Sequence, residues 1–138
     1  MHKIILFLLS TLLLSLSLSA EKISKDEARL AAKYFFYERL SVRSAVSFDD
    51  MEVENMLIRY VDGEEVLFIA NFKKGGWVIV PTHSSAPPVL AYSYQGKFTD
   101  LDLPPQLTSY LKSFSDQILY NKENSKNIMM FCLKQKNL

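Results

Sequence analysis

The sequence predicts an α+β domain in which an N-terminal helix and a C-terminal helix flank a four-stranded antiparallel β-meander. Two observations predict this class. Near both ends of the chain apolar residues recur every three or four positions, as in amphipathic helices, and between them short apolar runs alternate with turns. All four glycines fall in these turns, where positive φ is needed. The helices are expected to pack on the apolar face of one sheet.

The first twenty residues have the layout of a secretory signal peptide. Lys3 supplies a positive charge, an apolar run extends to Leu18, and Ser19-Ala20 places small residues before Glu21. The run is shorter than the roughly 20 apolar residues of a membrane-spanning helix. We expect cleavage after Ala20, a secreted or periplasmic location, and no membrane attachment after cleavage.

Charge and length restrict the function of the remaining chain. The 138 residues include 16 basic and 15 acidic side chains, and Lys3 belongs to the leader, so the chain from Glu21 onward is neutral. Nucleic-acid binders usually carry a basic excess, so nucleic acid is not an expected partner. The length suits one domain with its own core, expected to be monomeric before it meets a partner.

The start of the first helix is indicated by capping residues. Ser24 and Glu27 stand at the spacing of a capping box, and Ile23 and Ala28 at that of a hydrophobic staple. The helix is expected to end near Leu40, with a loop over residues 41–50. Its apolar face is expected to hold Ala28, Ala31, Ala32, Phe35, Phe36 and Leu40.

The middle of the chain reads as a meander. Asp62-Gly63 is a strong hairpin signal, and Lys73-Lys74-Gly75-Gly76 is a second tight turn. A polar loop with two prolines separates the third strand from the fourth. The four expected strands cover residues 56–61, 65–72, 77–80 and 89–94.

The second helix opens at Pro104-Pro105, since proline is tolerated at the first helical position. Its periodic apolar face runs from Leu107 to Ile118, and the pattern fades from Asn121. We therefore expect one domain over residues 21–123 and a C-terminal tail over 124–138. Cys132 is expected to be an unpaired thiol in that tail.

The residues offer little for catalysis, so we expect no enzyme, no catalytic residue and no cofactor. After the leader there is one histidine, His83, and one cysteine, Cys132, which nothing positions as a dyad. No metal site is expected, because zinc needs four clustered ligands. His83 is expected to be an exposed loop residue, and the acidic run from Asp49 to Glu54 a solvated strand edge.

Trp77, Tyr92 and Tyr94 lie on adjacent expected strands. They could form a stacking platform for bases, but a neutral protein gains little from phosphate attraction. A core or interface role is favoured. The residues alone therefore indicate a binding module.

The stretch from Phe68 to Phe98 resembles the prodomain of streptopain-type cysteine peptidases and the small stand-alone inhibitors related to it, the Spi proteins. The resemblance spans roughly Ser24 to Glu123. Its ordered pattern is an Asn-containing strand, a Gly-Gly turn, an aromatic-Val-Ile-Val strand, a polar loop and a final Tyr-Ser strand. Here these parts are Asn71, Gly75-Gly76, Trp77-Val78-Ile79-Val80, residues 81–88 and Val89-Leu90-Ala91-Tyr92-Ser93.

The resemblance implies reversible, non-covalent inhibition of a streptopain-family cysteine peptidase in trans, at or beside its active-site cleft. No papain-like catalytic Cys and His follow, so the chain is not expected to be the protease. A stiff Pro87-Pro88 segment would lower the ordering cost of binding. Alternatively, Asn71 only caps a strand end and the prolines only redirect the chain. The expected peptidase-contacting residues are Asn71, His83, Ser84, Ser85, Ala86, Pro87 and Pro88.

Two other readings stay open. The chain could be an orphan or truncated propeptide that assists the folding of a separate peptidase. It could also be an unrelated exported binding domain, such as a cystatin-like protein, although the Gln-x-Val-x-Gly hairpin signature is absent.

Overall fold

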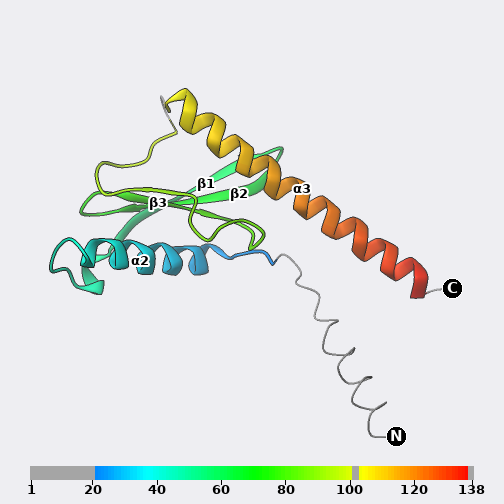
Figure 1. Ribbon diagram of the computed structural model, residues 1–138, viewed down its shortest axis with the longest axis horizontal. Helices are drawn as coiled ribbons and strands as arrows, with labels where there is room; N and C mark the ends of the chain where they lie inside the picture. The colour runs from blue at the N-terminus through cyan, green and yellow to red at the C-terminus, as the bar shows by residue number, and fades with distance from the viewer. Residues whose placement is uncertain (1–20, 101–102, 137–138) are drawn as a thin grey trace, which may run out of the picture.

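The computed structural model describes residues 21–100 and 103–136, with side chains described as far as Asn127. The expected signal peptide, residues 1–20, lies outside the described residues. Figure 1 shows a sheet with one helix on each side of it. In chain order the elements are α2 (Lys25–Ser41), a short 3-10 helix η1 (Phe48–Asp50), β1 (Val53–Val61), β2 (Glu64–Phe72), β3 (Trp77–Pro81), β4 (Ala91–Ser93) and α3 (Pro105–Lys136).

The four strands form one antiparallel sheet in the order β1-β2-β3-β4, which confirms the predicted meander and the α+β class. The first hairpin turns at Asp62 and Gly63, which both have positive φ (52° and 80°). This is the backbone that a tight hairpin with right-handed twist requires. β4 is shorter than the expected strand over residues 89–94, and the order of the sheet places it at one edge.

The two helices cover opposite faces of the sheet, whereas we had expected both on one apolar face. Successive residues of a strand point to opposite sides. Phe68, Ala70 and Phe72 of β2 pack in one buried cluster with Ala28, Ala32 and Phe36 of α2. Leu67 and Ile69 of the same strand pack in a second cluster with Leu111 and Ile118 of α3. β2 is buried on both faces, and the domain has three layers (Figure 1).

The predicted start of α2 is confirmed. The Glu27 backbone N–H donates to Ser24 Oγ over 3.2 Å, and the Ser24 backbone N–H donates to Glu27 Oε2 over 2.8 Å. Two N–H groups that the helix itself leaves unpaired are thereby satisfied. The helix then presents Phe36 to the sheet, where its ring stacks on Phe72 with centroids 4.2 Å apart.

The second helix, α3, continues to Lys136, through the segment that we had expected to be a mixed tail after Asn121. Residues 121–136 contain no glycine or proline to stop a helix, and many have good helix propensity. Loss of the apolar stripe therefore did not mark the end of the helix. Cys132 lies in this last part of α3, where side chains are outside the described residues.

Candidate functional site

Asn71 is held inside the domain. Its side chain is 2% exposed and lies on β2. Its Nδ2 donates to the Phe98 carbonyl over 3.1 Å and to Asn55 Oδ1 over 3.0 Å, and its Oδ1 accepts from the Phe98 backbone N–H over 2.7 Å. These bonds hold the segment after β4 against the sheet. Asn71 thus has a structural function in the free protein. From the sequence we had considered a structural function for Asn71 only in the form of a strand cap.

His83 is buried, which corrects the expectation of an exposed loop residue. The segment from Glu21 to Ile23 lies antiparallel to residues 82–84, with Lys22 paired to His83 in a single bridge. The Ile23 backbone N–H donates to the Thr82 carbonyl over 2.8 Å. This partner lies about sixty residues earlier in the chain, and no local pattern indicates such a pairing.

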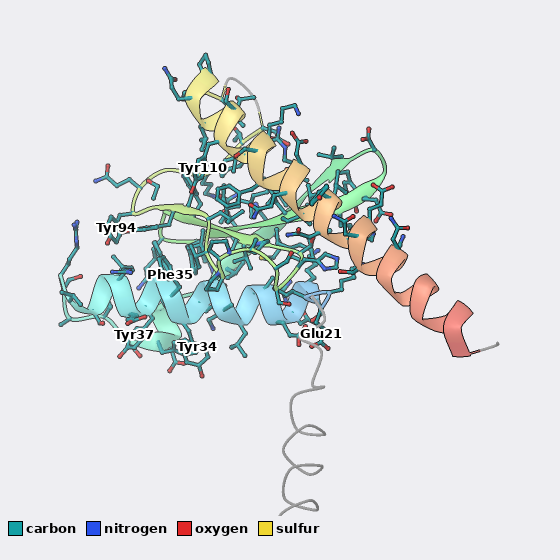
Figure 2. The ribbon with its side chains drawn as sticks, turned by 45° about the vertical axis from the view of Figure 1, so that its right-hand side comes forward. Glu21, Tyr34, Phe35, Tyr37, Tyr94 and Tyr110 are labelled. Atoms are coloured by element: carbon teal, nitrogen blue, oxygen red, sulfur yellow. The ribbon has the colours of Figure 1, made fainter. Side chains whose placement is uncertain are left out.

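Ser84 joins the same contact from the exposed side of the loop. Its Oγ accepts from the Glu21 backbone N–H over 2.9 Å, and its own backbone N–H donates to the Glu21 carbonyl over 3.0 Å. Figure 2 shows Glu21 at the start of α2. The first residues after the expected cleavage site therefore fix one end of the expected contact loop.

The rest of the loop contains both buried and exposed residues. Ala86 is buried, whereas Pro87 and Pro88 are exposed. Of the buried side-chain polar atoms in the described residues, His83 Nδ1 and Ser85 Oγ have no hydrogen-bond partner. Buried polar atoms of this kind are uncommon in folded proteins. Ser84 and the two prolines are thus the exposed residues of this loop.

Asn71 and the loop lie at opposite ends of one hairpin. Asn71 pairs with Trp77 at the start of β3, and Leu67 pairs with Pro81 at its end, where the loop begins. The structure therefore does not gather the seven expected contact residues into one patch. His83 to Pro88 form a single loop, and Asn71 is buried at the far end of the hairpin.

The charges around these segments are mostly paired. Along the acidic run, Asp50 pairs with Lys74 (2.6 Å) and Glu52 with Lys73 (3.1 Å), and Glu54 pairs with Lys97. The Lys74 ammonium lowers the pKa of Asp50. Three of the four carboxylates of the run are thus paired with lysines of the second turn and of the segment after β4. The run is not a free anionic surface.

The pKa of His83 is lowered from its ordinary value, first by burial and then by the positive charges of Lys122 and Lys22. Glu64 acts in the opposite direction, with a smaller effect. Burial disfavours the charged imidazolium and so favours the neutral form of His83.

The sequence reasoning missed an open groove of about 770 Å³ along the free edge of β4. Phe35 and Arg39 of α2 form one wall, and Leu107 and Tyr110 of α3 form the other. Figure 2 shows Phe35, Tyr94 and Tyr110 along this side of the molecule. The aromatic content of β4 was visible in the sequence. The groove was not, because it depends on the two helices lying on opposite faces.

Within residues 21–100 and 103–127, no three His, Cys, Asp or Glu side chains gather where they could hold a metal ion. No helix among the described residues is long and apolar enough to cross a membrane.

The domain has three layers, and its sequence places it in a family. Residues 20–118 match the family described as Spi protease inhibitor, and the chain belongs to that family. This confirms the resemblance seen in residues 68–98.

Two curated relatives are peptidases. The chain is 28% identical over 120 residues to the thiol protease/hemagglutinin PrtT of Porphyromonas gingivalis, covering 85% of the chain and 14% of that protein. It is 26% identical over 101 residues to streptopain of Streptococcus pyogenes, covering 72% of the chain and 25% of that protein. The chain thus spans a quarter or less of these relatives. No solved structure matches it.

Proposed function

We propose that the chain is an exported, reversible inhibitor of a streptopain-family cysteine peptidase. It acts in trans on the mature enzyme, at or beside the active-site cleft, and is not itself an enzyme. The observation that carries the proposal is the match of residues 20–118 to the Spi protease inhibitor family. The likeness to streptopain and to the Porphyromonas thiol protease over a small part of each supports a peptidase as the partner.

Inhibition without covalent chemistry agrees with the described surfaces. A stable interface buries about 1,600 Å² in total, of which a domain of this size can supply half. The loop from His83 to Pro88 remains our proposed contact segment, because Ser84, Pro87 and Pro88 are exposed on it. Its fixed start beside Glu21 and its two prolines reduce the entropy that binding must remove. Asn71 acts through the position of Phe98, and we propose it as an indirect contributor.

Export rests on the layout of residues 1–20, with cleavage after Ala20 and a secreted or periplasmic location. A chain that leaves the cell or enters the periplasm meets peptidases that are exported as well. We expect a monomer before complex formation.

The second candidate is a propeptide that assists folding of a separately encoded peptidase. The relatives favour it, since the region they share with this chain is only a small part of each. The two functions differ in the state of the enzyme that each recognises. An inhibitor lowers the activity of the folded peptidase, whereas a folding helper raises the recovery of activity from the denatured one.

One pair of assays separates these candidates. The chain is titrated against a mature streptopain-family peptidase, ideally from the same genome, while hydrolysis of a fluorogenic peptide is followed. In parallel, the denatured peptidase is diluted into buffer with and without the chain. We expect loss of activity at stoichiometric concentration in the first assay. Faster refolding in the second assay, with no inhibition in the first, would establish the helper instead.

The loop has its own test. Replacing His83-Ser84-Ser85 with Gly-Gly-Gly should weaken inhibition by at least about tenfold, because it removes the exposed Ser84 side chain and the hydrogen bond that its Oγ accepts from Glu21. A matched triple-glycine replacement of Ser44-Ala45-Val46, in the loop after α2, controls for added flexibility. Equal inhibition by the two variants would remove the His83 loop from the interface.

A further inference from the structure

The edge of the sheet at β4 is open on its outer side. β4 pairs with β3, and no other strand among the described residues pairs with it. An exposed edge strand presents unpaired backbone groups, which can add a strand from another chain. Charged side chains or prolines often protect such edges, and β4 (Ala91-Tyr92-Ser93) has neither.

The groove gives such an added strand a wall on each side. On the α2 side, Phe35 meets Tyr92 edge-to-face with centroids 5.0 Å apart. On the α3 side, Tyr110 Oη donates to the Leu90 carbonyl over 3.0 Å, which fixes the ring over the approach to β4. An extended segment places alternate side chains on opposite faces. One set would contact the α2 wall and the other set the α3 wall.

One of the residues that line the groove, Arg39, is positively charged, and Arg43 follows it one helical turn later, beyond the end of α2. Eight basic side chains of the described residues are in ion pairs. Arg39 and Arg43 are not among them. Their guanidinium groups lie 5.1 Å and 4.4 Å from the ring centroids of Phe35 and Tyr94. Within the described residues, these two arginines therefore have no carboxylate partner, although the chain pairs most of its other cations.

This charge argues against a second copy of the chain as the occupant. Antiparallel pairing of two β4 edges would put the α2 helices of both copies on one face of a continuous sheet. Arg39 of each copy would then lie on the same face of that sheet, and like charges across an interface disfavour association. A partner that brings a carboxylate to Arg39 gains an ion pair instead.

From this geometry we infer that the β4 groove binds an extended segment of the inhibited peptidase, which adds a strand at β4 and places a carboxylate against Arg39. The inference rests on the proposed function. It gives the inhibitor a second surface for contact with the peptidase, in addition to the loop from His83 to Pro88. Pro87 and Pro88 lead directly into Val89 and Leu90, which line the groove, so the surface continues the proposed contact loop.

The test uses the chain expressed with its own N-terminal segment and a mature streptopain-family peptidase as the probe. Arg39→Glu reverses the charge at this position, and Gln106→Trp fills the groove from exposed α3 surface. Arg29→Glu makes the same charge change on α2, where Arg29 pairs with Asp26 outside the groove. We expect both groove variants to weaken inhibition by at least about tenfold, and Arg29→Glu to leave it within about twofold.

Hydrogen exchange of the backbone amides of residues 91–93 gives an independent readout that does not need a variant. The inference predicts that these amides become protected when the peptidase is added. Full inhibition by Arg39→Glu and Gln106→Trp, or unchanged exchange at β4 in an inhibited complex, would overturn the inference and leave the proposed function standing. Absence of inhibition by the unaltered chain would overturn both. A stable dimer formed through β4 would also contradict the inference.

Discussion

Asn71 and Phe98 exchange two hydrogen bonds, one in each direction. The Phe98 backbone N–H donates to Asn71 Oδ1 over 2.7 Å, and Asn71 Nδ2 donates to the Phe98 carbonyl over 3.1 Å. Both residues are buried. Phe98 in turn packs edge-to-face on Trp77 with centroids 5.3 Å apart. The amide of one side chain thus fixes the segment between β4 and α3.

Asn71→Ala should lower the free energy of unfolding by about 2–3 kcal/mol, because it leaves two buried backbone groups of Phe98 without partners. Asn55→Ala removes a single bond at an exposed side chain and should cost below about 1 kcal/mol. Urea unfolding of both variants measures the difference. Equal stability of the two variants would contradict the structural function of Asn71. Measuring inhibition by the folded Asn71→Ala protein then shows how much Asn71 contributes to inhibition of the peptidase.

The stability of the domain should fall at acid pH in part because of His83. Its pKa is lowered in the folded state, so the unfolded chain binds more protons once the pH drops below about 6.5. The contribution of His83 to the free energy of unfolding is therefore fully present above that pH. It is lost as the pH falls toward the lowered pKa of His83 in the folded protein. The groups facing His83 are Lys22, Lys122 and Glu64.

The comparison that isolates this effect is unfolding at pH 7.5 and pH 5.0 for the unaltered chain and for His83→Gln. Carboxylates such as Asp50 and Glu27 titrate in both proteins and cancel. The unaltered chain should lose more stability than the variant between the two pH values. An equal or smaller loss would mean that the imidazole titrates at its ordinary pKa or above it.

The capping box at the start of α2 gives a local prediction. Ser24→Ala removes the acceptor for the Glu27 backbone N–H and should cost about 1 kcal/mol of stability. Ser44→Ala, at an exposed position beyond the end of α2, is the matched control and should change stability by less than about 0.5 kcal/mol. Thermal unfolding of the pair is sufficient. The expectation fails if the two variants have the same melting temperature.

Two glycines with positive φ should respond differently to alanine. At Gly76 (φ 91°) an added Cβ would overlap the Phe36 ring and lie 2.8 Å from the Ser93 carbonyl oxygen, whereas at Gly63 (φ 80°) it meets open space. Gly63→Ala carries only backbone strain, about 1–2 kcal/mol. Gly76→Ala adds the steric overlap and should cost at least about 3 kcal/mol. Similar losses in denaturant unfolding would show that β4 and α2 can move apart freely.

Much of this fold could be predicted because its signals are local. The Ser24–Glu27 cap, the Asp62-Gly63 turn and the Leu107 to Ile118 stripe each lie within a few residues, and the structure confirms all three. The face on which each helix packs could not be predicted in the same way. β2 is apolar on both sides, so its sequence permits a helix on either.

The candidate site was harder to predict, because its parts are distant in sequence. His83 pairs with Lys22 through the backbone, and the β4 groove is lined by Arg39 of α2 and Tyr110 of α3. Family resemblance supplied the expectation of a contact loop but not its support by the N-terminal segment. The length of α3 was also missed, since helix propensity continues after the apolar stripe ends.

The central claim is reversible inhibition of a folded peptidase in trans, and dilution of a preformed complex tests it most directly. Equimolar chain and mature streptopain-family peptidase are mixed until activity is lost, then diluted far below the inhibitory concentration. We predict that full activity returns and that the recovered chain has an unchanged intact mass. Activity that never falls, or that falls and does not return, would contradict the account.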